Sequence, residues 1–440
     1  MNINIYSSII LQNYIYLINI ILKEVIFIKK KKLYSPYTTL LVIYIFFILV
    51  AFFLDSPKNI FNGLKNIILS PDILISDYVE IGGIGASLIN SALTSILSML
   101  LLIITGVKPN GSTIMSLWLM TGFSFFGKNI VNVWPIIIGV YLYSRYQKEP
   151  FISYSLLALL STTLAPTVSQ FIFIEQFSNI YGVILGYGIG VLTGFLLAPI
   201  ASHAIKAHNG YNLYNIGFAA GLFSTLFMAI LRALGIDFES RLLWNTGSNF
   251  IFSILLFTVS IYLIVVGSIN NNNIKKSFIS LLKQPGRLVS DFYLLYGKTC
   301  YINMGILGIT STLLVLVLNA DLNGPTVCGI FTIMGFGAFG KHIKNVTPIL
   351  IGSILACIIN INPINSPSLI LAILFSTALA PIAGKFGFKF GILAGFLHVN
   401  MVTNIGYLHG GLNLYNNGLA AGFVAMILIP IITTFSKGDI

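Results

Sequence analysis

The stretch GFSFFGKNIVNVWPIIIG at residues 122–139 recurs as GFGAFGKHIKNVTPILIG at residues 335–352. Glycines, a lysine, an asparagine and a proline return in the same order 213 residues later. Repeats of this length are not the short units of a solenoid, so the match indicates a duplication of a large part of the chain.

Further matched blocks show how far the duplication extends. PDILISDY from Pro71 pairs with PGRLVSDF from Pro285, and NGST pairs with NGPT at nearly the same offset. HNGYNLYNIGFAAG from His208 pairs with HGGLNLYNNGLAAG from His409, with ten identities in fourteen positions, but here the offset is 201. We therefore expect two homologous halves, the first with an insertion near FIFIEQFSN. The expected regions are an N-terminal membrane segment with a basic anchor (1–70), repeat 1 (71–235), a connecting span and basic loop (236–284) and repeat 2 (285–440).

Composition places both halves in a membrane. Of the 440 residues, 56% are hydrophobic and 8% are charged, whereas a soluble domain carries about 25% charged residues. Apolar runs follow one another without strand alternation, and about 20 such residues cross a bilayer. The net charge of +12 lies in short clusters between these runs, which is typical of cytoplasmic loops rather than of nucleic-acid binding. The expected fold class is an all-α polytopic membrane protein.

Apolar segments recur in the same order in both halves. The first expected span covers residues 37–54, and entry of residues 5–22 into the membrane is left open. The further segments are 84–106, 113–126, 130–145, 151–174, 180–204, 211–235, 246–268, 300–319, 325–339, 345–361, 367–383, 386–408 and 412–435.

Charge asymmetry favours opposite orientations of the two halves. If every segment crosses, Lys148, Lys275 and Lys341 fall on the cytoplasmic side and the lysine-free loop NINPINSP falls outside. This agrees with the positive-inside rule and with seven crossings per half, as in transporters built from inverted-topology repeats. If the short segments 113–126 and 325–339 enter and return instead, the parity changes, so their path is left open.

Glycine and proline interrupt the short segments at equivalent positions. Each segment begins with NG(S/P)T, ends with GFxxFGK and is followed by a proline. These features indicate broken or re-entrant helices, which point to a transporter binding site when they recur in both halves. The lysines could instead snorkel to the interface, and the glycines could serve close helix packing. The candidate substrate-binding residues here are Asn110, Thr113, Lys128, Asn132, Asn323, Thr326, Lys341 and Asn345.

The NLYN blocks supply a second candidate set. Asparagine offers donors and acceptors without charge, and tyrosine supplies an amphipathic wall. A helix cap followed by a small-residue packing face is the alternative, but two amides per repeat exceed what one cap requires. These candidates are His208, Asn212, Tyr214, Asn215, His409, Asn413, Tyr415 and Asn416.

No catalytic or cofactor motif is evident in the sequence. The twelve carboxylates lie at or near segment ends, and Asp77 and Asp291 are expected to cap helices. HExxH, P-loop and GxSxG patterns are absent, and the three cysteines have no CxxC spacing. We therefore expect no catalytic residues, no metal and no cofactor.

The duplicated GFxxFGK and NLYN blocks resemble an uncharacterised family of bacterial multi-pass membrane proteins that carries only a domain-of-unknown-function label. A weaker architectural likeness is to urea transporters, since NGPTVCG at Asn323 and GGLNLYNNGLAAG at Gly410 are similar to their pore-helix motifs. The spacing differs, and NGST in the first half lacks the proline. These resemblances imply a duplicated membrane fold and give no substrate.

Together these patterns favour an integral membrane transport protein, channel-like or a uniporter, for a small polar or anionic solute. A multi-pass location in a bacterial cytoplasmic (inner) membrane is expected. The expected partners are membrane lipids and the solute, with no nucleic acid, and a homo-oligomer is left open. The alternatives are an intramembrane enzyme acting on lipid head groups and a non-transporting scaffold. Duplicated polar residues favour transport, because a catalytic centre usually needs asymmetric residues.

Overall fold

The computed structural model describes residues 35–174, 179–287 and 290–435, so the segment at 5–22 lies outside it. In these ranges the regular structure is helical apart from two isolated β-bridges. Nine of the helices described are long and apolar enough to cross a membrane. The expected class, an all-α multi-pass membrane protein, is thereby confirmed.

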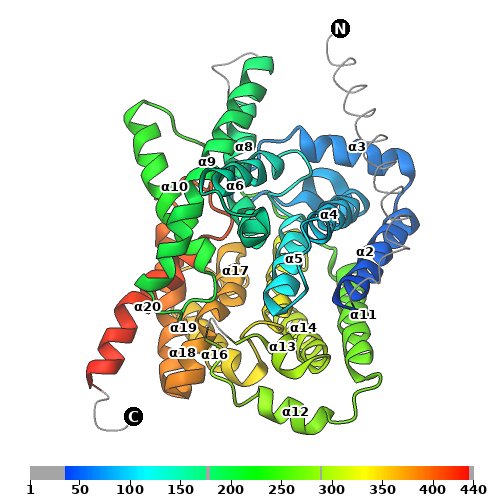
Figure 1. Ribbon diagram of the computed structural model, residues 1–440, viewed down its shortest axis with the longest axis vertical. Helices are drawn as coiled ribbons and strands as arrows, with labels where there is room; N and C mark the ends of the chain where they lie inside the picture. Colours follow the sequence, from blue (N-terminus) through cyan, green and yellow to red (C-terminus); the bar gives the residue numbers. More distant parts are fainter. Residues whose placement is uncertain (1–34, 175–178, 288–289, 436–440) are drawn as a thin grey trace. The chain divides into compact units, whose positions relative to one another are not determined.

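The chain divides into two compact units, residues 1–42 and residues 43–440, and the contacts reported below lie within the second. The helices follow the same order in both halves (Figure 1). The first half contains α2 (Ser35–Leu54), α3 (Pro57–Ile68), α4 (Tyr78–Ile104), α5 (Gly111–Phe123), α6 (Trp134–Tyr146), η1 (Phe151–Tyr154), α7 (Ser155–Ser161), η2 (Thr162–Leu164), α8 (Ala165–Ile172), α9 (Asn179–Ala207) and α10 (Asn215–Ala233). The second contains α11 (Asn249–Ser268), α12 (Ile274–Leu281), α13 (Phe292–Tyr296), α14 (Thr299–Val317), α15 (Gly324–Phe336), α16 (Ile343–Ile358), α17 (Pro367–Ser376), η3 (Thr377–Leu379), α18 (Ala380–Phe386), α19 (Phe388–Ile405) and α20 (Asn416–Phe435).

The chain is broken at glycine around the lysine loops, as the sequence predicted, and at two further positions that it did not predict. The 3₁₀ turns η2 and η3 divide the segments expected as continuous at 151–174 and 367–383, next to Pro166 and Pro381, which lack a backbone N–H. Gly127 and Gly340 turn the chain after α5 and α15 with φ of 85° and 108°, in the left-handed region that favours glycine. Each half therefore keeps its lysine loop between two short helices.

α5 and α15 pack against each other in opposite directions. Gly111, at the start of α5, lies against Ala338, just beyond the end of α15. Gly324, at the start of α15, lies against Phe125, just beyond the end of α5. Because both reciprocal contacts occur, the two helices are antiparallel and related by an approximate two-fold axis. The halves to which they belong are thus inverted along this direction.

Carboxylates from opposite halves cap these two helices. Gly111 N donates to both carboxylate oxygens of Asp291, at 3.0 and 2.8 Å, and Gly324 N donates to Asp77. The same aspartates cap their own helices, α13 and α4, as the sequence predicted. A buried helix N-terminus needs partners for its free N–H groups, and an anion suits its positive end. Each half therefore completes a helix of the other.

Glycine pairs bring the outer helices together. Gly139 of α6 lies against α9, and Gly352 of α16 lies against α19, so close that neither position has room for a Cβ. α9 has 29 residues and α19 has 18. Gly194 contacts Ile136 in the first half as Gly395 contacts Ile349 in the second, so these glycines are equivalent. The additional residues of the first half therefore lie before Gly194. This is the region in which the change of offset places an insertion.

α10 and α20 cross where their N-terminal turns meet. A Cβ on Gly217 would lie 2.7 Å from Cβ of Tyr415, and one on Gly418 would lie 2.8 Å from Cα of Gly217. From this crossing α10 rises and α20 descends in the view of Figure 1. The two NLYN segments therefore meet at the pseudo-two-fold axis, although 201 residues separate them.

Inversion predicts that equivalent exposed loops lie on opposite faces of the membrane. Lys148, between α6 and η1, and Asn362, between α16 and α17, are both exposed and occupy equivalent loops. Single-cysteine variants at the two positions, in a background without Cys300, Cys328 and Cys357, should react with a membrane-impermeant thiol reagent from opposite sides. Labelling of both from the same side of sealed vesicles would disprove the inverted arrangement.

Candidate functional site

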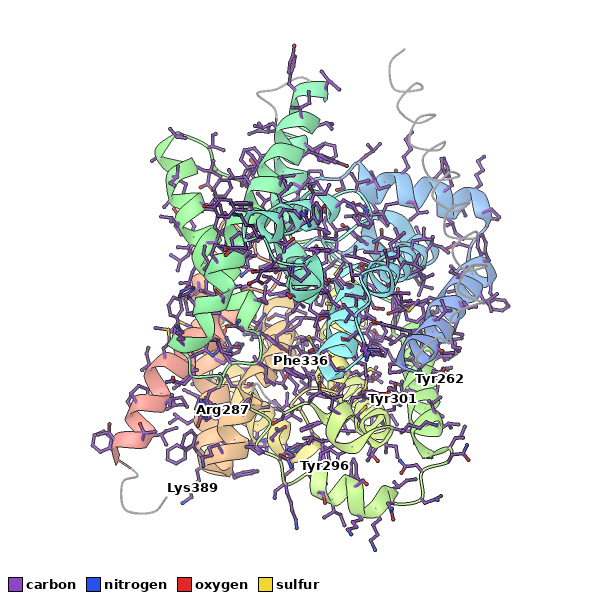
Figure 2. All side chains as sticks on the ribbon, in the orientation of Figure 1. Tyr262, Arg287, Tyr296, Tyr301, Phe336 and Lys389 are labelled. Carbon is purple, nitrogen blue, oxygen red and sulfur yellow. The ribbon has the colours of Figure 1, made fainter. Side chains whose placement is uncertain are left out.

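A cavity of about 190 Å³ lies where the short helices and the NLYN segments meet. Both halves contribute equivalent side chains to its wall, including Phe123 with Phe336 and Tyr214 with Tyr415. Figure 2 shows Phe336 in the interior, near α5 and α17. The lining residues are Met115, Leu119, Phe123, Leu160, Leu213, Tyr214, Asn215, Ile216, Gly217, Thr332, Phe336, Phe339, Phe375, Leu414, Tyr415 and Asn417.

Each lysine of the repeated loops binds a tyrosine of the other half. Lys128 Nζ donates to the Tyr415 hydroxyl at 2.7 Å, and Lys341 Nζ donates to the Tyr214 hydroxyl at 2.6 Å. Lys341 also donates to Thr377 Oγ1 at 2.7 Å. Both lysines are fully buried, so neither snorkels to an interface. The two exchanged pairs place one amino group behind each tyrosine of the cavity wall.

The lysine charges have aromatic neighbours and no carboxylate partner. Lys128 Nζ lies 5.3 Å from the Phe123 ring centroid, and Lys341 Nζ lies 4.9 Å from that of Phe336. Within the described ranges the salt bridge that occurs is Arg232–Asp237, on an outer loop. A buried ammonium without a counter-ion is costly. Burial therefore lowers the pKa of Lys128 to about 7 and the pKa of Lys341 well below its usual value. In the part of the chain that the structure describes, no carboxylate near the cavity is placed to act as a counter-ion for a protonated lysine.

Two buried asparagines, which sequence reasoning missed, hold the lysine loops. Asn90 Nδ2 donates to Ser124 O and Lys128 O, and Asn303 Nδ2 donates to Gly337 O and Lys341 O, at 2.7 to 2.9 Å. These carbonyls are freed by the ends of α5 and α15, and they lie where water cannot reach them. The signal was present in the sequence, since both asparagines interrupt apolar segments at the repeat offset of 213.

Asn132 and Asn345 brace the same loops from the other side. Asn132 Nδ2 donates to Gly127 O at 3.1 Å, and Asn345 Nδ2 donates to Gly340 O at 2.9 Å. Neither amide lines the cavity. The structure therefore gives both residues a part in fixing the lysine loop.

Asn212 and Asn413 join the halves at the helix crossing. Asn212 Nδ2 donates to Gly418 O at 2.9 Å, and Asn413 Nδ2 donates to Gly217 O at 3.0 Å. The Oδ1 atom of each accepts the backbone N–H of the tyrosine two residues later. Both side chains are fully buried behind the cavity wall. Their hydrogen bonds fix the tyrosines and the crossing together.

The paired histidines position the helix starts. His208 Nε2 donates to Asn215 Oδ1 at 3.0 Å, and His409 Nε2 donates to Asn416 Oδ1 at 2.7 Å. Burial lowers the pKa of both imidazoles below the usual value. They are therefore neutral at neutral pH. Of these four residues, Asn215 lines the cavity.

The NG(S/P)T residues lie at the far ends of the short helices. Asn110 Oδ1 accepts from Thr113 N at 2.8 Å, and Asn323 Oδ1 accepts from Thr326 N at 3.2 Å. These are N-caps of α5 and α15, and none of the four residues lines the cavity. Tyr214, Asn215 and Tyr415 are thus the candidate residues that face the cavity, with Lys128 and Lys341 directly behind.

The chemistry available in the cavity is that of hydrogen bonding and charge. Among the residues that the structure describes, no group of three or more His, Cys, Asp or Glu side chains could hold a metal ion. Cys300, Cys328 and Cys357 are free thiols buried between helices. The tyrosine hydroxyls and the ammonium groups behind them are the polar groups placed symmetrically about the cavity.

Fold and site together define a multi-pass α-helical membrane protein with two inverted halves around a central cavity. A family model described as "Protein of unknown function (DUF1576)" matches residues 56–233 and again residues 270–434. These matches cover well over half of the chain, so the protein belongs to this family, and they begin just before α3 and α12. No curated protein and no solved structure matches the chain.

Removal of the Asn212 amide should destabilise the helix crossing. Asn212→Ala leaves Gly418 O and Tyr214 N without their partner in a dry environment, which costs about 1–3 kcal/mol. We expect a lower unfolding temperature in detergent, and a decrease for Asn413→Ala as well, because the Oδ1 atom of Asn413 also accepts from Thr163 Oγ1. The exposed Asn404 is the control, because its replacement by alanine should leave the unfolding temperature unchanged. If both variants, Asn212→Ala and Asn413→Ala, unfolded at the same temperature as the wild type, this role would be contradicted.

Proposed function

We propose that the protein transports a small polar or anionic solute across a bacterial cytoplasmic membrane, through the cavity between its halves. The observation that carries this proposal is the pair of exchanged contacts, Lys128 with Tyr415 and Lys341 with Tyr214, at one cavity on a pseudo-two-fold axis. Inverted repeats with broken helices at equivalent positions are the architecture in which transporters place their binding sites.

An anionic solute fits the charge around the cavity best. The two buried lysines have no carboxylate partner among the described residues, and an anion in the cavity would favour their protonated, charged form in this low-dielectric site. The tyrosine hydroxyls lie between the lysines and the cavity and can donate to a carboxylate or a similar group. The remaining wall is largely apolar and would exclude a large hydrated ion. A small organic anion is therefore the preferred solute class.

The exchanged pairs also support a moving interface between the halves. Each lysine belongs to the loop of one half, and its tyrosine belongs to the helix start of the other half. A change in the angle between the halves would alter both contacts. Alternating access in inverted-repeat transporters is such a movement of one half against the other. The two lysine–tyrosine contacts have nearly equal lengths, as expected if each closes one side of the cavity and the two open alternately.

The two alternatives make different demands on the same residues. An enzyme acting on lipid head groups needs a nucleophile or an acid–base pair facing substrate, and the described cavity wall offers tyrosines and amides. A scaffold needs no cavity and no buried charge. Turnover of a lipid by the purified protein would support the first alternative, and wild-type behaviour of all cavity variants would support the second.

Substitution of the lysines tests anion selectivity. Lys128→Gln and Lys341→Gln keep a hydrogen-bond donor but remove the charge, and loss of a charge-assisted hydrogen bond costs about 1.5–3 kcal/mol. We expect each change to weaken the flux of lactate into proteoliposomes about tenfold or more. Flux of the equally sized neutral lactamide should change little, so the double variant should lose selectivity for lactate.

The exposed Lys148 supplies the matched control, since Lys148→Gln removes a charge far from the cavity. Its lactate flux should equal that of the wild type. Equal lactate flux in the wild type and the folded double variant would exclude the lysines from selectivity. Absence of saturable flux of either probe, relative to empty liposomes, would count against transport of small organic anions.

A further inference from the structure

The first half contains a buried carboxyl group, Asp72, that has no equivalent in the second half. Asp72, in the segment between α3 and α4, is fully buried. Its Oδ2 atom accepts hydrogen bonds from Ser169 Oγ at 2.8 Å, Asn132 Nδ2 at 2.9 Å and Asn129 Nδ2 at 3.2 Å. Sequence reasoning placed the carboxylates at segment ends and did not single out this one.

The two oxygens of Asp72 have very different surroundings. All three donors are directed at Oδ2, whereas Oδ1 is buried and has no hydrogen-bond partner. An ionised carboxylate spreads its charge over both oxygens, so an unpartnered buried oxygen is costly. A protonated carboxyl instead has one oxygen that accepts and one that carries hydrogen. The pattern of donors suits a carboxyl that takes up a proton at Oδ1.

Few charges face Asp72 from the elements around it. On α4 the titratable neighbour is Tyr78, whose hydroxyl also hydrogen-bonds with the Asp72 carboxyl. In the segment after α10 it is Arg241, which donates to Pro71 O at 3.4 Å rather than to the carboxylate. α8 contributes the Ser169 hydroxyl, which donates to the carboxylate, and the Gln170 amide, which donates to the backbone carbonyl of Asp72. The lysine loop contributes the amides of Asn129 and Asn132. The neighbouring groups therefore supply hydrogen-bond donors to the carboxylate and no ion pair.

The equivalent positions of the second half cannot do the same. Gly286 stands where the first half has Asp72, and Gly384 stands where it has Ser169. The Asn129 position is occupied by His342, whose Nε2 lies 2.8 Å from Gln284 O. Backbone atoms approach closely there, since a Cβ on Gly384 would collide with Pro285. An otherwise repeated site thus has one titratable carboxyl, in the first half.

A short chain of contacts joins Asp72 to the cavity. Asn132, which donates to Asp72, also donates to Gly127 O within the loop that carries Lys128. Lys128 in turn donates to Tyr415 of the cavity wall. A change in the charge of Asp72 therefore acts directly on the loop that sets the Lys128–Tyr415 contact.

We propose that Asp72 is the proton-binding site that couples solute movement to a proton gradient, an inference that rests on the proposed transport function. Oδ1 takes up one proton when the site communicates with the acidic side and releases it when the site communicates with the other side. The bond formed and broken is O–H, so the net process is movement of one proton with the anion. The protein is then a symporter rather than the uniporter favoured by its sequence.

Two observations favour a proton over a metal cation at this site. The atoms directed at Asp72 are N–H and O–H donors, whose hydrogens would repel a sodium ion, whereas Na⁺ needs several oxygen ligands. Burial also raises the pKa of Asp72 to about 7, despite the lowering effect of its hydrogen bonds. The carboxyl therefore gains and loses its proton in the range of pH that cells maintain.

Transport by Asp72→Asn tests the coupling, because asparagine mimics the protonated carboxyl and cannot release a proton. Wild-type proteoliposomes with an inward proton gradient should accumulate lactate. The variant should lose accumulation, while lactate–lactate exchange without a gradient stays within about twofold of wild type. Asp237→Asn is the matched control, since this carboxylate is exposed on the loop after α10 and should leave both activities unchanged. Proton-driven accumulation by Asp72→Asn, or accumulation driven by sodium alone, would overturn the proposal.

Unfolding gives a second readout that needs no transport. The folded-state pKa of Asp72 is above the ordinary value of 3.8, so the native state binds this proton more tightly than the unfolded state. The stabilisation is present at low pH and is lost as pH rises from about 4 to about 7. The wild-type unfolding temperature should therefore fall relative to Asp72→Asn by several degrees across this range. Asp77, with its pKa also raised to about 7 by burial, is present in both proteins and cancels in the difference.

The two readouts separate the inference from the function on which it rests. Parallel pH profiles of the two proteins would overturn proton binding at Asp72 whatever the transport result. Diverging profiles without lactate flux would keep the proton site and reject transport of this anion. Diverging profiles together with loss of accumulation in Asp72→Asn would support both.

Discussion

Buried helix ends impose the main constraint on this structure. α5 and α15 are 13 residues long, about 20 Å, and both begin and end inside the protein. Lipid and water cannot satisfy their terminal N–H and C=O groups there. The N-terminus of each is bound by an aspartate of the other half, and the carbonyls at each C-terminus are bound by an asparagine of its own half. Neither half can form its short helix in full without the other, so duplication and site formation are linked.

The lysine–tyrosine pairs follow from this arrangement. Because α5 and α15 are antiparallel, their C-terminal loops face the NLYN segments of the opposite half. Each lysine amino group is buried next to a tyrosine hydroxyl and two aromatic rings, where the protonated form is poorly solvated and the pKa is lowered. Such a charge is stabilised by any anion that enters the cavity. The same contacts that hold the halves together thus define what the cavity can accept.

Symmetry is incomplete at the positions that can bind protons. Both halves share the backbone path, the lysines, the tyrosines and the asparagines of the helix crossing. Asp72, in contrast, is replaced by Gly286 at the equivalent position of the second half. In the proposed transport cycle, a strictly symmetric protein would have two gates of equal energy. One titratable carboxyl beside one lysine loop would make the energies of the two gates depend differently on pH. Coupling to a gradient requires such a difference.

The sequence by itself determined the membrane class, the duplication and the glycine breaks around the lysine loops. These follow from local composition and from patterns along the chain, and Lys128, Lys341 and the NLYN tyrosines were recognised because they are repeated. Only the tertiary structure decided which residues meet. Asn212 and Asn413 bind across the helix crossing, and Asp72 receives donors from residues 57 to 97 positions away. Burial and the direction of a hydrogen bond depend on such distant neighbours, so a single sequence does not reveal them.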